Sequence, residues 1–391
     1  MNKQYDFLIV GTGIIGMTIA YELKKRDKNS RIALVEKEAD VAMHASGRNS
    51  GVLHAGFYYS KESLKARFTV EGNRRMKAFC KEAGIAVNPC EKVVVAKDAD
   101  ELKQLYELEQ RARTNGVEAR LISVEELKGI DPNVYTYQKA LYSPTTASVN
   151  PKEVCLALKN VLISQGVEFF FNERFEKKST RFSYAYLINC AGLYADEIAH
   201  DFQAGMEYTI LPFKGIYLKY MGDKSTVKTN VYPVPNLNNP FLGVHFTKTY
   251  DGSIKIGPTA IPAFWRENYA GLSRLKMQEL FSISYRIFKL FITNAFHFRH
   301  IALEEIKNYN RAIFIAKAKK MVKKTGGDFQ PLPSGIRAQL LNKKTSELVM
   351  DFLVEHKEGS THVLNAVSPA FTCSFAFAEH VVDEIEKKRS L

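Results

Sequence analysis

The fold of this 391-residue chain is decided by the stretch Asp6-Phe7-Leu8-Ile9-Val10-Gly11-Thr12-Gly13-Ile14-Ile15-Gly16. Its first five residues are typical of a buried parallel strand, and its glycines have the spacing Gly-x-Gly-x-x-Gly. Gly11 permits a tight turn, Gly13 lets a pyrophosphate approach the backbone, and Gly16 lets a helix pack closely on the strand. A second strand is expected over residues 31–35. It ends at Glu36, whose carboxylate would accept hydrogen bonds from ribose hydroxyls. This order of elements predicts a dinucleotide-binding site.

The identity of the dinucleotide is narrowed by two further observations. The carboxylate of Glu36 would repel a 2′-phosphate, which argues against NADP. No second Gly-x-Gly-x-x-Gly occurs downstream, so a separate nicotinamide site is not expected. The dinucleotide is therefore either NAD or an FAD that the substrate reduces directly.

Composition sets the broad class of the protein. Hydrophobic residues make up 46% and charged residues 25% of the chain, which is the balance of a globular protein with a sizeable core. The five cysteines are scattered without a Cys-x-x-Cys pair, which argues against a disulfide framework or a zinc site. No targeting segment precedes the first strand, and no apolar run is long enough to span a membrane. A cytoplasmic protein without a metal is expected.

The loop after the second strand carries a family resemblance. It runs Ala45-Ser46-Gly47-Arg48-Asn49-Ser50-Gly51-Val52-Leu53-His54, with small residues where a backbone must lie close to a flat ring system. This stretch resembles the D-amino-acid-oxidase-like superfamily of FAD enzymes and, within it, the L-2-hydroxyglutarate oxidases and dehydrogenases. The resemblance continues in blocks along nearly the whole chain: 63–66, 189–192, 212–215, 241–247, 257–260, 335–339 and 365–370.

The resemblance implies how the chain would hold FAD. The adenine half would lie on the glycine turn and Glu36. The isoalloxazine would lie against residues 46–51 and His54, beside a turn near the C-terminus. The cofactor contacts expected in this way are Gly11, Gly13, Ile14, Ile15, Gly16, Glu36, Ser46, Arg48, Asn49, Ser50, Gly51, His54, Ala191, Gly192, Ser368, Pro369 and Ala370.

The resemblance also implies an activity. Such an enzyme would oxidise L-2-hydroxyglutarate to 2-oxoglutarate by hydride transfer from C2 to flavin N5, and pass electrons to a membrane quinone or oxygen. Ile216 and Thr259 depart from the family pattern. Another 2-hydroxy acid or an amino acid therefore stays open as the substrate. A flavin-bearing RNA-binding or RNA-modifying protein is a further alternative, although no nucleic-acid partner is expected.

Four side chains are candidates for the chemistry on the substrate. The reaction needs a base for the hydroxyl proton, and histidine suits this role because its ordinary pKa lies near neutrality. His54 and His245 occur in the family-like blocks, and His54 could instead tether the flavin covalently. Arg337 is similar in position to the carboxylate-binding arginine of related amino-acid oxidases, and a guanidinium grips a carboxylate through two hydrogen bonds. Lys214 could meet the distal carboxylate of a dicarboxylic acid.

The chain is expected to form an α/β fold with two domains. A discontinuous Rossmann-like FAD-binding domain would comprise residues 1–85, 145–210 and 335–391. An α+β substrate domain with a mixed sheet would comprise residues 86–144 and 211–334. Within it, Ser123 is expected to cap a helix whose Glu126 reaches back to the cap, since Ser-x-x-Glu is the capping-box pattern.

A basic segment accounts for most of the formal charge of +13. Residues 274–324 hold twelve Lys or Arg against three acidic residues. Within the segment, residues 280–303 are expected to form one helix with a polar stripe and a wide apolar arc. Such a helix fits peripheral contact with an anionic membrane through residues 280–324. The alternative is a helix buried against the substrate domain with a solvated lysine face.

Overall fold

The computed structural model describes residues 4–235 and 242–389, and its first large sheet is the nucleotide-binding type expected from the N-terminal motif. The strand order in this sheet is β17-β18-β10-β1-β2-β9. All neighbours are parallel except β17 and β18. The strands are β1 (Gln4–Val10), β2 (Ile32–Val35), β9 (Glu168–Phe170), β10 (Ser183–Asn189), β17 (Leu353–Lys357) and β18 (Ser360–Asn365).

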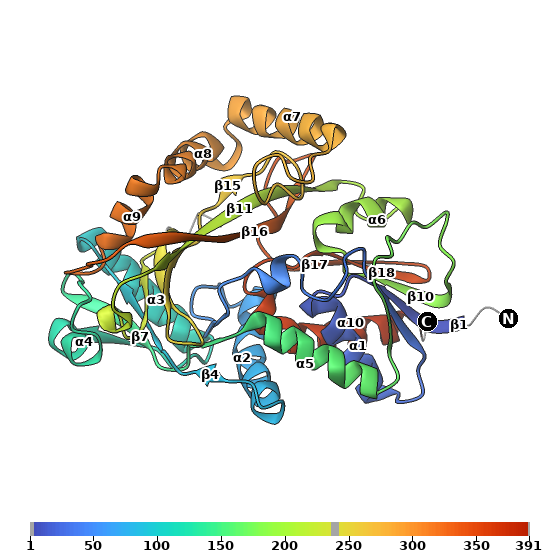
Figure 1. Cartoon of the computed structure of the whole chain (residues 1–391), viewed down its shortest axis with the longest axis horizontal. Helices are drawn as coiled ribbons and strands as arrows, with labels where there is room; N and C mark the ends of the chain where they lie inside the picture. Colours follow the sequence, from blue (N-terminus) through green and yellow to red (C-terminus); the bar gives the residue numbers. More distant parts are fainter. Residues whose placement is uncertain (1–3, 236–241, 390–391) are drawn as a thin grey trace.

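Helices cover this sheet and bury its apolar residues. Ile9, Leu34 and Met17 are fully buried in the cluster between sheet and helices. Ser63 begins a helix by accepting a hydrogen bond from the Ala66 amide, as an N-cap does. The helices are α1 (Ile14–Arg26), α2 (Leu64–Glu82), α5 (Pro151–Ser164) and α10 (Ala370–Arg389), with α6 (Ala195–Asp201) nearby. In Figure 1, α1, α5 and α10 lie below the strands of this sheet, and α6 lies above them.

The second large sheet is mixed. Its order is β15-β11-β14-β13-β12-β5-β7-β6, and β16 pairs with β11. Only the pair β12 and β5 is parallel among the described neighbours. The strands are β5 (Lys92–Val95), β6 (Arg120–Ser123), β7 (Lys139–Ser143), β11 (Tyr208–Tyr220), β12 (Asn230–Pro233), β13 (His245–Lys248), β14 (Ile254–Gly257), β15 (Ile261–Pro262) and β16 (Phe329–Asn342).

The remaining elements connect or flank the two sheets. A small sheet has the order β3-β8-β4, with β3 (Val52–Leu53), β8 (Ala147–Val149) and β4 (Val87–Asn88). The other α-helices are α3 (Ala99–Thr114), α4 (Val124–Ile130), α7 (Met277–Thr293), α8 (Phe298–Ile306) and α9 (Arg311–Lys319). Short 3-10 turns are η1 (Ala45–Gly47), η2 (Gly192–Tyr194), η3 (Lys224–Thr226), η4 (Ala295–His297) and η5 (Lys307–Tyr309).

The expected fold class is confirmed, since parallel and antiparallel sheets are combined with helices in one α/β structure. The capping box at Ser123 and Glu126 is also present. The first sheet draws its strands from the start, middle and end of the chain. The residue boundaries of the two domains stay a prediction.

The single helix expected over residues 280–303 is wrong. Helix α7 ends at Thr293, and α8 begins at Phe298. Between them Asn294, Phe296 and His297 have φ angles of 50°, 42° and 59°, which a helix does not allow. The turn lets Phe298 enter the core cluster that also contains Leu290. Tertiary packing therefore overrides the helical periodicity of the segment.

Candidate functional site

A cavity of about 920 Å³ lies between the two large sheets. It begins at the carboxyl ends of β1 and β2, where open parallel sheets bind ligands, and reaches β13 and β16. Gly11 and Glu36 line one end, and His245 and Arg337 line the other. The volume is that of a site for a cofactor together with a small substrate.

The nucleotide end of the cavity has the geometry that the first motif requires. Gly11 has a φ of 102°, and a Cβ there would lie 2.5 Å from the Cys190 carbonyl oxygen. The amide and the hydroxyl of Thr12 each donate to one oxygen of Glu36 at 3.0 Å. The Ile14 amide, at the start of α1, donates to Ser46 Oγ at 2.9 Å. These hydrogen bonds hold Glu36 and the loop at Ser46 beside the N-terminus of α1, where free backbone amides can bind a phosphate.

Most of the expected cofactor contacts line this cavity, although their role in binding stays a prediction. They are Gly11, Gly13, Ile14, Ile15, Glu36, Ser46, Arg48, Asn49, Ser50, His54, Ala191, Gly192, Ser368, Pro369 and Ala370. Gly16 and Gly51 do not line it. A Cβ on Gly16 would lie 2.1 Å from the Gly11 carbonyl oxygen, and one on Gly51 would lie 2.3 Å from that of Val149. These two glycines therefore let backbone segments approach each other.

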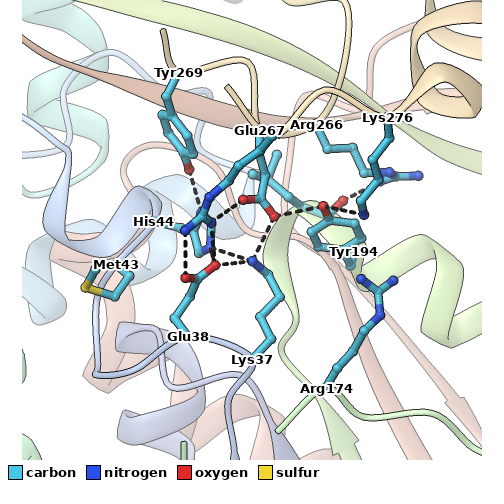
Figure 2. Close-up of polar contacts among 12 residues, drawn as sticks. Lys37, Glu38, Met43, His44, Arg174, Tyr194, Arg266, Glu267, Tyr269 and Lys276 are labelled. Carbon is cyan, nitrogen blue, oxygen red and sulfur yellow. Dashed lines mark hydrogen bonds and ion pairs between the residues drawn. The ribbon is translucent and has the colours of Figure 1, made fainter. Parts of the chain in front are cut away.

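Figure 2 shows a cluster of charged side chains beside the nucleotide end. Glu38, His44 and Glu267 bring three atoms of metal-ligating type within 4.8 Å of one another. However, Lys37 Nζ binds both carboxylates and lies 2.9 Å from His44 Nε2, and Arg274 Nη1 also binds both carboxylates. Burial raises the pKa of Glu267, but hydrogen bonds from Lys37 and Arg274 outweigh it and hold the pKa at about 2. The two cations already neutralise this cluster.

At the opposite end, His245 is buried and held as a neutral imidazole. Burial lowers the pKa of His245 to about 3, although the hydrogen bond to the Gly243 carbonyl opposes the shift. Nδ1 lies 2.8 Å from that carbonyl oxygen, which can only accept, so Nδ1 carries the proton and Nε2 has a lone pair. The ring stacks on Tyr232 with 3.6 Å between centroids. His245 therefore has the tautomer that a proton acceptor needs.

His54 lines the same end but has a different neighbour. Its Nδ1 lies 3.4 Å from Nζ of Lys92, which is fully buried and does not line the cavity. Burial lowers the pKa of His54 well below its usual range, and the charge of Lys92 lowers it further. The backbone amide of His54 donates to the Thr372 hydroxyl and its carbonyl accepts from the Asn73 side chain, which fixes the backbone at this position.

Arg337 lines the cavity together with a second cation, Lys65. Arg337 lies on β16 opposite Phe213 of β11. Burial lowers the pKa of Lys65 to about 8, and the charge of Arg337 contributes to the lowering. The charge of Asp351 opposes this lowering, and the Asp351 carboxylate also accepts hydrogen bonds from the amides of residues 64, 65 and 352. The hydroxyl of Tyr58 is buried, and it has no hydrogen-bond partner in the part of the chain that the structure describes.

Lys214 is not brought into the cavity. Its neighbours Phe213 and Gly215 line the cavity, and side chains alternate between the two faces of a strand. The side chain of Lys214 therefore lies on the other face of β11, where it is buried. We therefore correct the expectation that Lys214 contacts the substrate, because its side chain lies on the face of the strand that is turned away from the cavity.

Lys65 and Lys92 were missed by sequence reasoning. Lys65 follows the capping Ser63 in one of the family-like blocks, so its place at a helix start was visible. Lys92 begins the run Lys92-Val93-Val94-Val95, which is buried throughout. A lysine at the start of an apolar strand indicates a buried amine. The sequence does not tell which side chains surround that amine, because they come from distant segments.

Comparison with known proteins places the chain in a family. The sequence model described as FAD dependent oxidoreductase matches residues 6–384. The L-2-hydroxyglutarate dehydrogenase of Escherichia coli K12 is 33% identical, and the alignment covers 98% of this chain and 93% of that protein. The mitochondrial L-2-hydroxyglutarate dehydrogenase of Homo sapiens is 34% identical, with 100% and 90% covered.

The fold has a close structural counterpart. The dithionite-reduced L-α-glycerophosphate oxidase of Mycoplasma pneumoniae, solved with FAD bound, superposes with a TM-score of 0.74. The match covers 97% of this chain and 94% of that chain at 22% identity. The two proteins share a fold.

Proposed function

The chain belongs to the family of FAD-dependent oxidoreductases, and we propose that it oxidises L-2-hydroxyglutarate to 2-oxoglutarate. The names of its relatives support this substrate, and the side chains that line the cavity include a base and two cations suited to it. Another 2-hydroxy acid or an amino acid is the alternative substrate that the test below separates.

The nucleotide end fits FAD. The turn at Gly11 has no room for a Cβ, and the Glu36 carboxylate lies where a ribose would bind. The start of α1 offers a positive helix end to a pyrophosphate. Bound FAD supplies the acceptor for the hydride that leaves C2 of the substrate.

The pair Arg337 and Lys65 is the observation that carries the proposal. Both cations line the same cavity, and burial lowers the pKa of Lys65, with Asp351 opposing the shift and Arg337 adding to it. A substrate dianion would contact both cations, because each of its carboxylates can accept hydrogen bonds from one of them. We assign Arg337 to the carboxylate beside C2, through two parallel hydrogen bonds. Lys65 then binds the distal carboxylate and orients the substrate.

His245 is assigned as the base. Its Nε2 has a lone pair, because Nδ1–H is bound to the Gly243 carbonyl. Its lowered pKa keeps it neutral through the ordinary pH range. As the hydride leaves C2, Nε2 accepts the hydroxyl proton, and Gly243 holds the ring in position. The tyrosines that line this end help to keep water from the reacting carbon.

The test is an anaerobic absorbance titration of the FAD-loaded protein with L-2-hydroxyglutarate, with the D-enantiomer as control. We expect the L form alone to bleach the flavin and to yield 2-oxoglutarate. Bleaching by L-amino acids or by monocarboxylic 2-hydroxy acids, but not by L-2-hydroxyglutarate, would contradict the proposal. A flavin that RNA ligands affect and no small acid reduces would support the RNA-binding alternative instead.

We further propose that the protein contacts an anionic membrane through α7 to α9. No helix among the described residues is long and apolar enough to cross a membrane. The outer face of α7 nevertheless exposes an apolar stripe, in which Phe281, Tyr285 and Phe288 are 66%, 67% and 63% exposed. Figure 1 shows α7 and α8 at the outer edge of the molecule, beyond β11 and β15. Exposed lysines at 319, 320, 323 and 324 would attract anionic headgroups.

Vesicle co-sedimentation tests this surface. We expect binding to vesicles with phosphatidylglycerol, but not to phosphatidylcholine alone, and loss of binding at high salt. Phe281→Ser with Phe288→Ser should weaken binding, whereas Ile163→Ser, an exposed apolar control on α5, should not. Equal binding by both variants would contradict the proposed surface. A membrane quinone or oxygen is the proposed electron acceptor, and the rate of reoxidation by each in the same vesicles decides between them.

A further inference from the structure

Lys92 is a buried charged group that the reaction described above does not use. Its side chain is 0% exposed and belongs to the first residue of β5. Among residues 4–235 and 242–389, no carboxylate lies within ion-pair distance of its Nζ, and the nearest polar contact that the structure shows is His54 Nδ1 at 3.4 Å. Burying an amine without an anion is costly, so a packing role alone accounts poorly for a lysine here.

Three aromatic rings surround this amine. The Nζ of Lys92 lies 4.1 Å from the ring centroid of Tyr232, 5.3 Å from that of Tyr58 and 5.6 Å from that of Phe57. Burial lowers the pKa of Lys92 to about 7. Ring faces attract an ammonium and therefore favour the charged form against this burial. The amine is thus mainly protonated below about pH 7, where its contact with His54 is that of an ammonium.

The charge of Lys92 determines the direction of its contact with His54. An ammonium has three hydrogens and no lone pair, so it can only donate. Nδ1 of His54 must then accept, and the proton of the neutral imidazole lies on Nε2. Because Nδ1 is turned to Lys92 behind the cavity wall, Nε2 is the ring nitrogen left for the cavity. His245 has the opposite tautomer, since its Nδ1–H donates to Gly243.

We propose that Lys92 is a positioning residue that holds His54 as the Nε2–H tautomer. His54 then donates a hydrogen bond into the cavity, and the task of accepting the substrate proton is left to His245. The assignment of these roles rests on the proposed oxidation of a 2-hydroxy acid. The tautomer itself does not, because it is a property of the protein without substrate.

The tautomer is measured by long-range ¹H–¹⁵N NMR on protein labelled in its histidines, with and without FAD. The signals of His54 are those lost in His54→Gln. We expect Nε2–H in the wild type and a mixture of tautomers in Lys92→Met. Lys24→Met is the matched control: Lys24 is also a buried lysine, but it donates to the carbonyls of residues 28 and 30 at 2.7 and 3.0 Å, far along the chain from His54. An Nδ1–H tautomer in the wild type, or no change in Lys92→Met, would overturn the proposal.

Stability and kinetics give a second readout. Lys92→Met should raise Tm by about 2 °C or more, because it removes a buried amine without an anion, whereas Lys24→Met should lower Tm. The limiting rate of flavin reduction by L-2-hydroxyglutarate should fall about tenfold in Lys92→Met, with little change in substrate affinity.

A lower Tm with an unchanged tautomer would make Lys92 a packing residue. If the wild type were not reduced at all, the proposed function would fail while the tautomer still decided the role of Lys92. If Lys92→Met does not fold, the tautomer of His54 in the wild-type spectrum still tests the proposal, because an Nδ1–H tautomer would overturn it.

Discussion

The two ends of the cavity satisfy their charges in different ways. Beside the nucleotide end, Lys37 and Arg274 each bind both Glu38 and Glu267, so the charges of this cluster are paired within the protein. At the substrate end, Lys65 and Arg337 line the same cavity, and the contacts of the Lys92 amine with described residues are an imidazole and aromatic rings. The second end also holds the carboxylates Asp351 and Glu305, whose charges act on Lys65 and Arg337 respectively. We propose that a dianionic substrate binds at this second end.

Loss of the base should have the largest effect. In His245→Gln we expect the limiting rate of flavin reduction to fall by about 10²- to 10⁴-fold, since general-base catalysis contributes that much. FAD should stay bound, because His245 lies at the other end of the cavity. Stopped-flow reduction of the loaded variant measures the effect. A variant as fast as the wild type would remove His245 from the role of base.

Loss of the arginine should have the next largest effect. Arg337→Ala should lower kcat/KM by roughly 10²- to 10³-fold, the effect of two charge-assisted hydrogen bonds. KM should rise and kcat should fall, because the guanidinium both binds and orients the substrate. Steady-state kinetics on protein with a full complement of FAD checks this. Unchanged kinetics would place Arg337 outside the substrate site.

The lysine at the substrate end should impose a pH limit. Lys65 has a pKa lowered to about 8, so its charge is present below that pH and is lost above it. We expect kcat/KM for the dicarboxylate to fall about tenfold per pH unit above pH 8, whereas for a monocarboxylic 2-hydroxy acid it should change little. Parallel pH profiles of the two substrates test this. Equal decline for both substrates would show that another group is titrating.

A change at the nucleotide end should be the smallest and should spare the chemistry. Glu36→Gln keeps an acceptor for ribose but removes the charge, so we expect FAD affinity to weaken by about tenfold or less. The reduction rate of the loaded variant should match the wild type. Flavin fluorescence on dilution measures the affinity. A large loss of rate at saturating FAD would mean that the two ends are not independent.

The nucleotide end was readable from sequence because its parts are close together in the chain. The turn at Gly11, the acid at Glu36 and the loop at Ser46 lie within one strand-helix-strand unit and the segment that follows it. Local geometry then fixes what each residue does. Even here, Gly16 and Gly51 pack backbone on backbone and do not line the cavity.

The substrate end was only partly readable, because strands distant in sequence build it. His245 and Arg337 line the cavity, and their roles stay predictions. Lys214 does not line it, because the sequence shows the alternation along β11 but not which of the two faces meets the cavity. Lys65 and Lys92 acquire meaning only when α2 and β5 pack beside the cavity. The break between α7 and α8 is likewise not indicated by a glycine or a proline. It accompanies the burial of Phe298 in a core cluster, which depends on tertiary packing. Phe241, in another family-like block, lies outside the described residues.

We propose that two cations at one end of the cavity bind the two carboxylates of the substrate. The most direct test compares L-2-hydroxyglutarate with L-2-hydroxyvalerate, which has the same carbon chain without the distal carboxylate. We expect the ratio of their kcat/KM values to fall by about 30-fold from wild type to Lys65→Met, the equivalent of roughly 2 kcal/mol, with no change in the exposed control Lys61→Met. A ratio that is the same in all three proteins would contradict the claim.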